Sequence, residues 1–398
     1  MSEARCLARS ALVEAMRECR ARTIAWTCDL GDAQWRVPQQ PGINPIAWEL
    51  AHLAWFAEFW ILRGPHDVDA KGRTQARRPA MHAGPDTLLD SSLLAHADRW
   101  SAPLPSREKV FEMMASQLEA CIDAVPDDDN DDALYFHRLA LFHEDMHGEA
   151  FAWLRAKMGY PPPFGVTLER LAEPGRVEVR GGAIHVGSSA AGPGFAFDNE
   201  LLGRDITVAD FEIDACPVTA GQYLRFVESG GYDRSEYWTG EAGVWRAQAK
   251  RSHPERWRRM TTHSRSDVRW EVRWFDRWKA LDPEQPVIHV NAFEAEAYCL
   301  WATRRLPSAA QWEYAARRVV AFEWRHRAWE WTTDAFEPYP GFVAGPYKEY
   351  SAPWFGNHRE LRGGAFATHA RMHDARYRNF FTPERSDVFA GFRTIAHE

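Results

Sequence analysis

The sequence has 398 residues, 45% of them hydrophobic, and a formal net charge of −8. This length predicts two or three domains, and the apolar share is ordinary for a globular chain. The acidic balance argues against general nucleic-acid binding, which favours basic surfaces. No apolar run could span a bilayer, the N-terminus has no signal-peptide core, and the six cysteines form no C-x-x-C pair. We therefore expect a cytoplasmic protein without membrane or nucleic-acid partners.

The first 160 residues have the apolar periodicity of helices. Ser106 is a plausible N-cap, and Pro45 is well placed in a first helical turn. The segment Gly64 to Pro85 is expected to be a loop. Four long helices predict a bundle, in which metal sites are built from facing helices. The predicted helices cover residues 1–29, 45–62, 106–124 and 131–158.

Three histidines of this region form a candidate metal site. His143 and His147 are spaced i, i+4, which puts both imidazoles on one helix face. His52, from a different helix, would complete a set of three ligands and leave coordination positions open. His137 precedes His143 by six residues and points to another face, so it is not expected to be a ligand. His66, His82 and His96 lie in or near loops and lack a pairing spacing.

The residue after His143 leaves a second interpretation of the histidine motif open. Glu144 gives the pattern H-E-x-x-H, in which zinc proteases use the glutamate as a general base. Imidazole suits iron, zinc and copper, so ligand type alone does not choose the metal. The all-helical setting and a third histidine on a distant helix favour iron over the hydrolase.

The remainder of the chain predicts a mixed domain. Three consecutive prolines, Pro161 to Pro163, cannot continue a helix and begin a linker that we place at residues 161–176, between domains at 1–160 and 177–398. Residues 177–187 are expected to form a strand, a turn and a strand. The fold class is therefore α+β. The clearest helices in the second domain are predicted at residues 220–229, 292–302 and 308–318.

Several ordered motifs give the chain a family resemblance. N-P-x-x-W-x-x-x-H ending at His52, followed by W-F-x-E-F-W, resembles the first metal segment of the ergothioneine-type sulfoxide synthases. The resemblance implies a DinB-like four-helix bundle and a formylglycine-generating-enzyme-like (C-type-lectin-like) mixed domain. It implies iron(II) held by His52, His143 and His147, oxygen as co-substrate, and hercynine (Nα-trimethylhistidine) as substrate. The second domain carries the matching segments 214–219, 286–291, 305–315, 329–332, 361–366 and 390–393.

The tail at residues 377–385 resembles the hercynine-binding stretch of that family. The resemblance implies that Asn379 binds the amino-acid end and that Phe380 faces the trimethylammonium group, to which a phenyl ring offers cation–π attraction. Without the resemblance, these aromatic residues would be read as core packing. Phe381, Arg385 and Met146 complete the predicted substrate contacts. A proton donor is also expected, and spacing does not choose among Tyr339, Tyr347, Tyr350 and Tyr377.

Three departures from the family pattern bear on the second substrate. Phe381 stands where a carboxylate would hold the amine of a thiol donor, residues 90–93 contain no tyrosine, and Met146 replaces a glutamine. With these departures, the chain resembles the selenoneine-synthase branch of the family. We therefore predict C–Se bond formation between hercynine and a selenosugar. The alternative is C–S bond formation with a thiol donor. Remoter alternatives are a metal-dependent hydrolase or thiol transferase, and a non-catalytic binding module.

Overall fold

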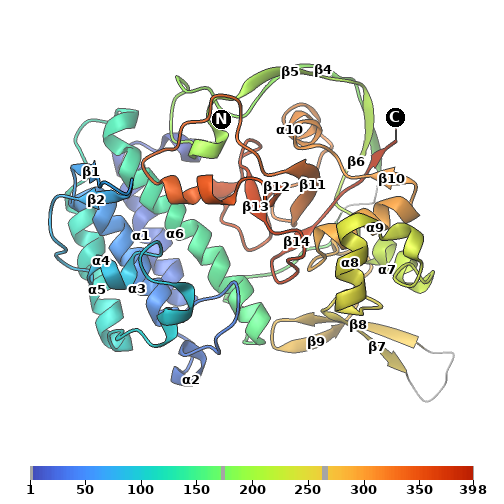
Figure 1. The fold of residues 1–398 in the computed structure, drawn as a ribbon, viewed down its shortest axis with the longest axis horizontal. Coiled ribbons are helices and arrows are strands. Elements are labelled where there is room, and N and C mark those ends of the chain that lie inside the picture. Colours follow the sequence, from blue (N-terminus) through green and yellow to red (C-terminus); the bar gives the residue numbers. More distant parts are fainter. Residues whose placement is uncertain (1–2, 172–174, 262–267, 398) are drawn as a thin grey trace. The chain divides into compact units, whose positions relative to one another are not determined.

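The computed structural model describes residues 3–171, 175–261 and 268–397, and the chain forms two compact units (Figure 1). Unit 1 comprises Met1–Phe164 with Pro193–Ala196 and Gly345–Glu349. Unit 2 comprises Gly165–Gly192, Phe197–Ala344 and Tyr350–Glu398. Of the linker expected at residues 161–176, positions 172–174 lie outside the described residues.

Unit 1 is built on four long helices that pack against one another, which confirms the predicted bundle. The segment predicted as a loop after residue 64 is partly wrong, because two three-residue strands pair there in an antiparallel hairpin. Both strands are short and polar, so alternation of apolar residues could not reveal them. The elements are α1 Arg9–Ala25, α2 Asp32–Trp35, α3 Ile46–Ala57 with a π turn at Glu58–Leu62, β1 His66–Val68, β2 Thr74–Ala76, α4 Asp86–Leu89, α5 Arg107–Asp123 and α6 Asp131–Met158.

Helix α6 carries two of the three histidines and begins and ends where the sequence predicts. The Asn130 side chain accepts a hydrogen bond of 2.8 Å from the Ala133 backbone N–H, and two aspartates in the first turn complement the helix dipole. Gly159 ends the helix with a left-handed φ of 68°. The resulting 28-residue helix is about 42 Å long.

Helix α3, which carries His52, is buried on nearly all sides. A helix with this burial is a central element of its bundle. Its buried polar residues are Glu49 and His52. Because burying polar groups costs free energy unless they are hydrogen-bonded, their partners define the functional part of the bundle.

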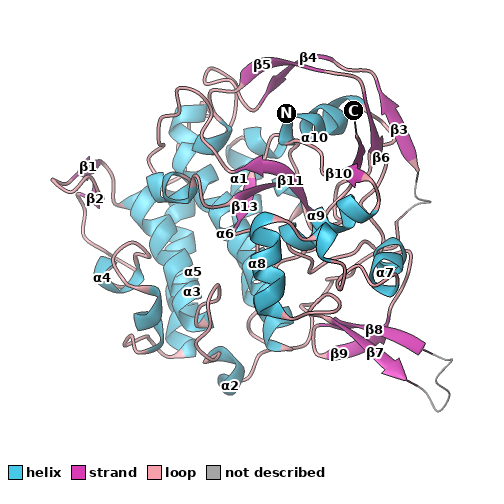
Figure 2. Cartoon of the chain, turned by 45° about the vertical axis from the view of Figure 1, so that its right-hand side comes forward, coloured by secondary structure: helices cyan, strands magenta, loops and turns pink. Residues whose placement is uncertain are grey.

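Unit 2 contains several small sheets and four helices among its described residues (Figure 2). The predicted strands near residues 177–187 exist, but they do not pair with each other: β3 pairs with β6, and β4 pairs with β5. The elements are β3 Arg176–Val179, β4 Gly182–Val186, β5 Arg204–Val208, β6 Phe211–Asp214, α7 Ala220–Glu228, α8 Gly240–Ala249, β7 Trp257–Thr261, β8 Val268–Trp274, β9 Arg277–Ala280, α9 Ala292–Trp301, β10 Arg304–Arg305, α10 Ala309–Arg318, β11 Trp329–Ala335, β12 Arg359–Gly363, β13 Asn379–Phe381, β14 Ala390–Gly391 and β15 Ile395–Ala396.

Four of these strands, in the order β13-β12-β11-β14, form the sheet that contains the predicted substrate-binding tail. Only the β11–β14 pair is parallel, so the α+β class is confirmed. The three helices predicted in this unit are α7, α9 and α10, whereas α8 and the three-stranded sheet β7-β8-β9 were not predicted. None of the described helices combines the length and hydropathy that a membrane crossing requires.

Candidate metal centre

The structure brings the three predicted histidine ligands together in unit 1. His52 comes from α3, and His143 and His147 come from successive turns of α6. Each offers a nitrogen atom, and these nitrogens all lie within 4.8 Å of one another. Nitrogens at this separation can share one metal ion, because imidazole nitrogens lie about 2.0–2.1 Å from a bound divalent metal.

Hydrogen bonds fix the tautomers of two of these rings. The Nδ1–H of His52 donates to the Leu89 carbonyl at 2.8 Å, and the Nδ1–H of His147 donates to Glu49 Oε1 at 2.8 Å. Both rings are thereby left with a free Nε2 lone pair, which is the form that binds metal. Burial also lowers the pKa of His52 to about 3 and holds the pKa of His143 well below its ordinary value. These two imidazoles are therefore neutral near pH 7.

Glu49 supports the site from behind His147. Its carboxylate is buried and also accepts a hydrogen bond of 3.3 Å from the Asn44 side-chain amide. Asn44 in turn accepts a 2.7 Å hydrogen bond from Arg99, whose guanidinium lies 4.0 Å from the centre of the Trp48 ring. A carboxylate bonded to a ligand histidine orients the ring and raises its basicity. The sequence places Glu49 three residues before His52, and the general need of metal-bound histidines for an acceptor is the signal that could have identified it.

His143 differs from the other two rings. Its Nδ1 is buried and has no hydrogen-bond partner among the described residues. The ring is held instead by parallel stacking on Phe56, with ring centres 3.6 Å apart and an interplanar angle of 8°. This stacking fixes the plane of the ring, and His143 still offers one nitrogen within 4.8 Å of those of His52 and His147. Three imidazoles with one adjacent carboxylate therefore fit a divalent transition metal such as iron(II).

Glu144, the potential base of the H-E-x-x-H reading, is held away from the histidines. Its two carboxylate oxygens accept hydrogen bonds of 2.8 and 2.9 Å from the Arg20 guanidinium of α1, and both side chains are buried. A carboxylate held in this way cannot activate a water at the ligand nitrogens. The geometry therefore disfavours the metal-dependent hydrolase.

This arrangement gives a first prediction. We expect the double substitution Arg20→Met with Glu144→Leu to leave iron content unchanged and turnover within about threefold, because replacing a buried ion pair by apolar groups of similar size is often neutral for stability. Metal analysis and initial rates check it. A protease-like role for Glu144 predicts instead that turnover disappears while iron remains bound.

A small cavity opens beside the triad within unit 1. It measures about 30 Å³, roughly the volume of one water or diatomic ligand. Asp90, Ser91 and Ser92, the stretch noted for lacking a tyrosine, contribute to its wall. The other lining residues are His52, Trp55, Phe56, Phe59, Trp60, Arg73, Thr74, Tyr347 and Glu349.

Of the four candidate tyrosines, Tyr347 is the one that the described contacts place against a ligand histidine. Its ring centre lies 5.8 Å from that of His143 and 4.9 Å from that of Phe56. The other three belong to unit 2. Tyr350 and Tyr377 share a hydrogen bond of 3.1 Å between their hydroxyls, and the ring of Tyr339 lies 4.2 Å from the Arg378 guanidinium. Burial raises the pKa of Tyr339 to about 12 and that of Tyr350 well above its ordinary value.

Three of the predicted hercynine residues, Asn379, Phe380 and Phe381, form strand β13 of unit 2, and Arg385 lies in the turn that follows. The Asn379 side chain accepts a 2.9 Å hydrogen bond from the Phe380 backbone, and Phe380 stacks on Phe336 with ring centres 4.1 Å apart. Because neighbouring residues of a strand face opposite sides, Asn379 and Phe381 share a face that Phe380 does not. The Arg385 guanidinium lies 4.7 Å from the centre of the Phe381 ring.

Two further predicted residues lie in unit 1. Met146 is a partly buried residue of α6, just before His147. His137, predicted not to be a ligand, lies outside the cluster, and its Nε2 is 3.2 Å from the Cys121 carbonyl.

Two family models match this chain. Residues 165–328 and 327–398 match the sulfatase-modifying factor enzyme 1-like domain, and residues 15–151 match the DinB superfamily. The predicted order of a DinB-like bundle followed by a formylglycine-generating-enzyme-like domain is thereby confirmed.

The chain also resembles characterised proteins over most of its length. It is 28% identical to the hercynine oxygenase of Mycolicibacterium thermoresistibile, covering 97% of this chain and 94% of that protein. It is 29% identical to the hercynine oxygenase of Mycobacterium tuberculosis, with 95% and 96% covered. The formylglycine-generating enzyme of Streptomyces coelicolor is 25% identical over 55% of this chain and 88% of its own length. These names refer to hercynine and not to selenium, so they support the wider prediction of a hercynine enzyme rather than the selenosugar.

Proposed function

The chain belongs to the family of the sulfatase-modifying factor enzyme 1-like domain and is a non-haem iron(II) oxidoreductase, and from that premise we propose that it uses oxygen to join a chalcogen atom to the imidazole of hercynine. The observation that carries the proposal is the cluster of three imidazoles, two of them buried, on a DinB-type bundle. Relatives named as hercynine oxygenases over nearly the whole chain support the choice of substrate.

His52, His143 and His147 would hold the iron, with Glu49 fixing the orientation of His147. When bound, the iron supplies one-electron redox chemistry with oxygen. The chain's own residues prepare the surroundings. Phe56 and Trp60 form aromatic walls of the small cavity, and hydrogen bonds hold two of the ligand rings in the metal-binding tautomer.

Tyr347 is our choice for the proton donor. Its ring lies against His143 and Phe56 in the wall of the cavity, whereas the other candidates are engaged with partners in unit 2. A phenol in this place would hold a proton at its oxygen until a reacting group in the cavity takes it.

We expect Tyr347→Phe to lower turnover by about 10²- to 10⁴-fold, the usual contribution of a general acid, and to leave iron affinity unchanged. Steady-state rates and metal titration check this. Tyr350→Phe is the matched control and should stay near the wild-type rate. Equal losses in the two variants would remove Tyr347 from the role of proton donor.

For hercynine itself, we propose contacts with Asn379, Phe380, Phe381 and Arg385 of the tail and with Met146 beside the ligand His147. The amide of Asn379 suits the amino-acid end, and the Phe380 ring suits the trimethylammonium group by cation–π attraction. Substitution of these residues is expected to raise KM for hercynine more than it lowers kcat, because they bind the substrate away from the reacting carbon.

The donor of the chalcogen has two candidates. A thiol donor is the reading that the hercynine oxygenase relatives support best. A selenosugar is the second candidate, favoured by the surroundings of Phe381, where the Arg385 guanidinium covers the ring at 4.7 Å. This guanidinium is itself paired with Asp387 at 2.8 Å, so the argument for a neutral sugar rests on Phe381, whose ring cannot pair with the ammonium group of an amino thiol.

Competition between donors distinguishes the two candidates. The iron-loaded protein is supplied with hercynine, oxygen and equal concentrations of γ-glutamylcysteine, cysteine and 1-seleno-glucose, and products are identified by mass. A selenium-containing product in excess supports the selenosugar, and exclusive formation of a sulfur product excludes it.

A further inference from the structure

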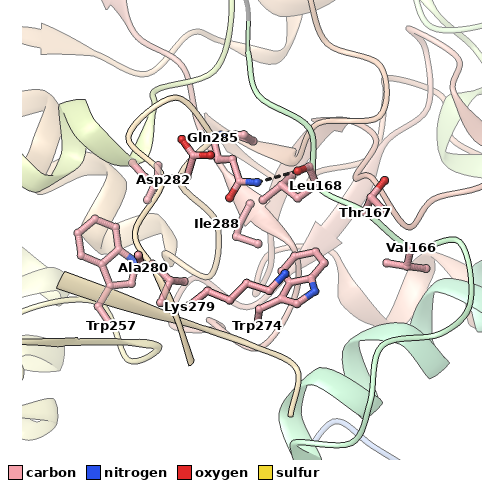
Figure 3. A pocket seen from close by; sticks show the side chains of 14 residues that line it. Val166, Thr167, Leu168, Trp257, Trp274, Lys279, Ala280, Asp282, Gln285 and Ile288 are labelled. Carbon is pink, nitrogen blue, oxygen red and sulfur yellow. Dashed lines mark hydrogen bonds between the residues drawn. The ribbon is translucent and has the colours of Figure 1, made fainter. Parts of the chain in front are cut away.

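Unit 2 contains a second, much larger cavity that no step of the proposed reaction uses (Figure 3). Its volume of about 400 Å³ lies in the range of pockets for small organic molecules. The sheet β7-β8-β9, residues 166–168 and the segment before α9 form its walls. All of its lining residues belong to unit 2, so the inference drawn from it is independent of the metal centre.

The walls provide a flat apolar surface. Trp257 lies on β7, Val272 and Trp274 lie on β8, and Val287 and Ile288 come from the segment before α9. Figure 3 shows Trp257 and Trp274 on opposite sides of the pocket, with the Lys279 side chain extending toward the Trp274 ring. Two indole rings with branched aliphatic side chains between them suit a flat, largely apolar body.

Hydrogen-bond donors in the cavity lack acceptors. Trp257 is only 3% exposed, yet its indole N–H donates to no group among the described residues. The indole nitrogen is not one of the fully buried polar atoms that lack a partner, so it is open to the solvent of the cavity. The N–H of Trp274 likewise has no acceptor within the described part of the chain. A ligand oxygen would satisfy either of them.

The cavity also carries one uncompensated positive charge. Lys279 Nζ lies 5.0 Å from the centre of the Trp274 ring, and no carboxylate of the described residues forms an ion pair with it. The single carboxylate in the lining, Asp282, is already held by Arg170 at 2.8 Å and by the Glu284 backbone N–H at 3.2 Å. Gln285 donates its amide N–H to the Leu168 carbonyl at 2.7 Å. The polar side-chain groups of the pocket that have no partner among the described residues are therefore mostly hydrogen-bond donors. The ammonium group of Lys279 lies at the Trp274 end.

We propose that this cavity is a binding site for a small organic carboxylate with a flat apolar body and a second oxygen at its far end. The carboxylate pairs with the Lys279 ammonium, the apolar body lies along Val272 and Val287, and the far oxygen accepts from the indole N–H of Trp257. Lys279 is exposed, so this pairing is a charge-assisted hydrogen bond at the solvent-facing end of the pocket.

Three probes separate the parts of this arrangement. 6-Hydroxy-2-naphthoate has both ends, 2-naphthoate lacks the far oxygen, and 6-hydroxy-2-naphthamide lacks the charge. Calorimetric titration of the full-length protein should give the tightest binding for 6-hydroxy-2-naphthoate, with a Kd of about 1 mM or below. The two incomplete probes should each bind at least about fivefold more weakly.

Substitutions assign the contacts. Because Lys279 is exposed, Lys279→Met should weaken binding of the two carboxylate probes by about three- to fivefold and leave binding of the amide probe unchanged, whereas Lys279→Arg should retain most of the binding. Trp257→Phe keeps an aromatic wall and should affect only the probes that carry a hydroxyl group. Lys250→Met removes a positive charge elsewhere in unit 2 and is the matched control. Each variant is first compared with the wild type by thermal unfolding.

Two results would overturn the proposal. One is that none of the probes binds the wild-type protein at millimolar concentration. The other is that Lys279→Met and Lys250→Met, both folded like the wild type, bind 6-hydroxy-2-naphthoate as the wild type does. Neither result depends on turnover of hercynine, so failure of this site and failure of the proposed enzymatic function are separate outcomes.

Discussion

His147→Ala is expected to yield a folded protein that contains almost no iron and turns over at least about a thousandfold more slowly than the wild type. His147 supplies one of three nitrogens that lie within 4.8 Å of one another, and it is the one tied to a carboxylate. Two remaining imidazoles would form an incomplete set with much weaker affinity. Iron per chain, measured by mass spectrometry of the metal, and the initial rate with hercynine check the expectation.

The same helix offers a matched control. His137 is also buried on α6, but its ring contacts the Cys121 carbonyl and not the cluster. His137→Ala removes the same side chain from a similar environment and should keep its iron. Glu49→Gln is expected to fall between the two, with metal affinity reduced by about 10- to 100-fold, because it keeps the bond to His147 but loses the charge. Retention of full iron and full turnover by His147→Ala would contradict the assignment of the site.

Arg393→Met is expected to lower the free energy of unfolding by about 3–5 kcal/mol. Arg393 and Glu330 are both fully buried in unit 2, with Nη2 and Oε1 2.8 Å apart, and the guanidinium also donates to the backbone carbonyls of Asp214 and Ala215. The single substitution leaves the Glu330 carboxylate buried with Trp312 as its remaining described donor. Urea unfolding measures the loss.

Two further variants test the physical cause. Replacing both partners, as in Arg393→Met with Glu330→Leu, should recover much of the lost stability, since no buried charge then remains without a partner. Arg17→Met breaks an ion pair with Glu119 in which both side chains are about half exposed, and it should lower stability far less than Arg393→Met does. A loss for Arg393→Met no larger than that of Arg17→Met would show that the buried pair contributes no more than a surface pair.

The parts of the fold that local patterns determine were predicted well. Helix α6 begins after Asn130 and ends before Gly159, where capping residues mark both ends. Pairings between distant segments were not predictable in the same way. β3 and β4 are consecutive in the chain, yet they pair with β6 and β5, respectively, because sheet partners depend on tertiary packing rather than on local alternation.

The candidate site likewise contains residues that local sequence patterns could predict and residues whose positions depend on tertiary packing. The i, i+4 spacing of His143 and His147 on a helix implies a shared face, and the motif around His52 supplied the third ligand. The direction of Glu144 could not be predicted, because it depends on Arg20 of another helix. Nor could spacing choose Tyr347, which comes from a segment 200 positions after His147 and reaches the bundle only in the folded unit.

The central claim is that this chain, loaded with iron(II), uses oxygen to modify hercynine. The most direct measurement supplies iron-loaded protein with hercynine, γ-glutamylcysteine, cysteine and 1-seleno-glucose, with and without oxygen, and follows hercynine and oxygen together. We predict that both are consumed in step, that a product with a carbon–sulfur or carbon–selenium bond forms, and that neither occurs without oxygen or in His147→Ala. Hercynine left unchanged in the presence of oxygen and every donor, or a product formed equally without oxygen, would contradict the account.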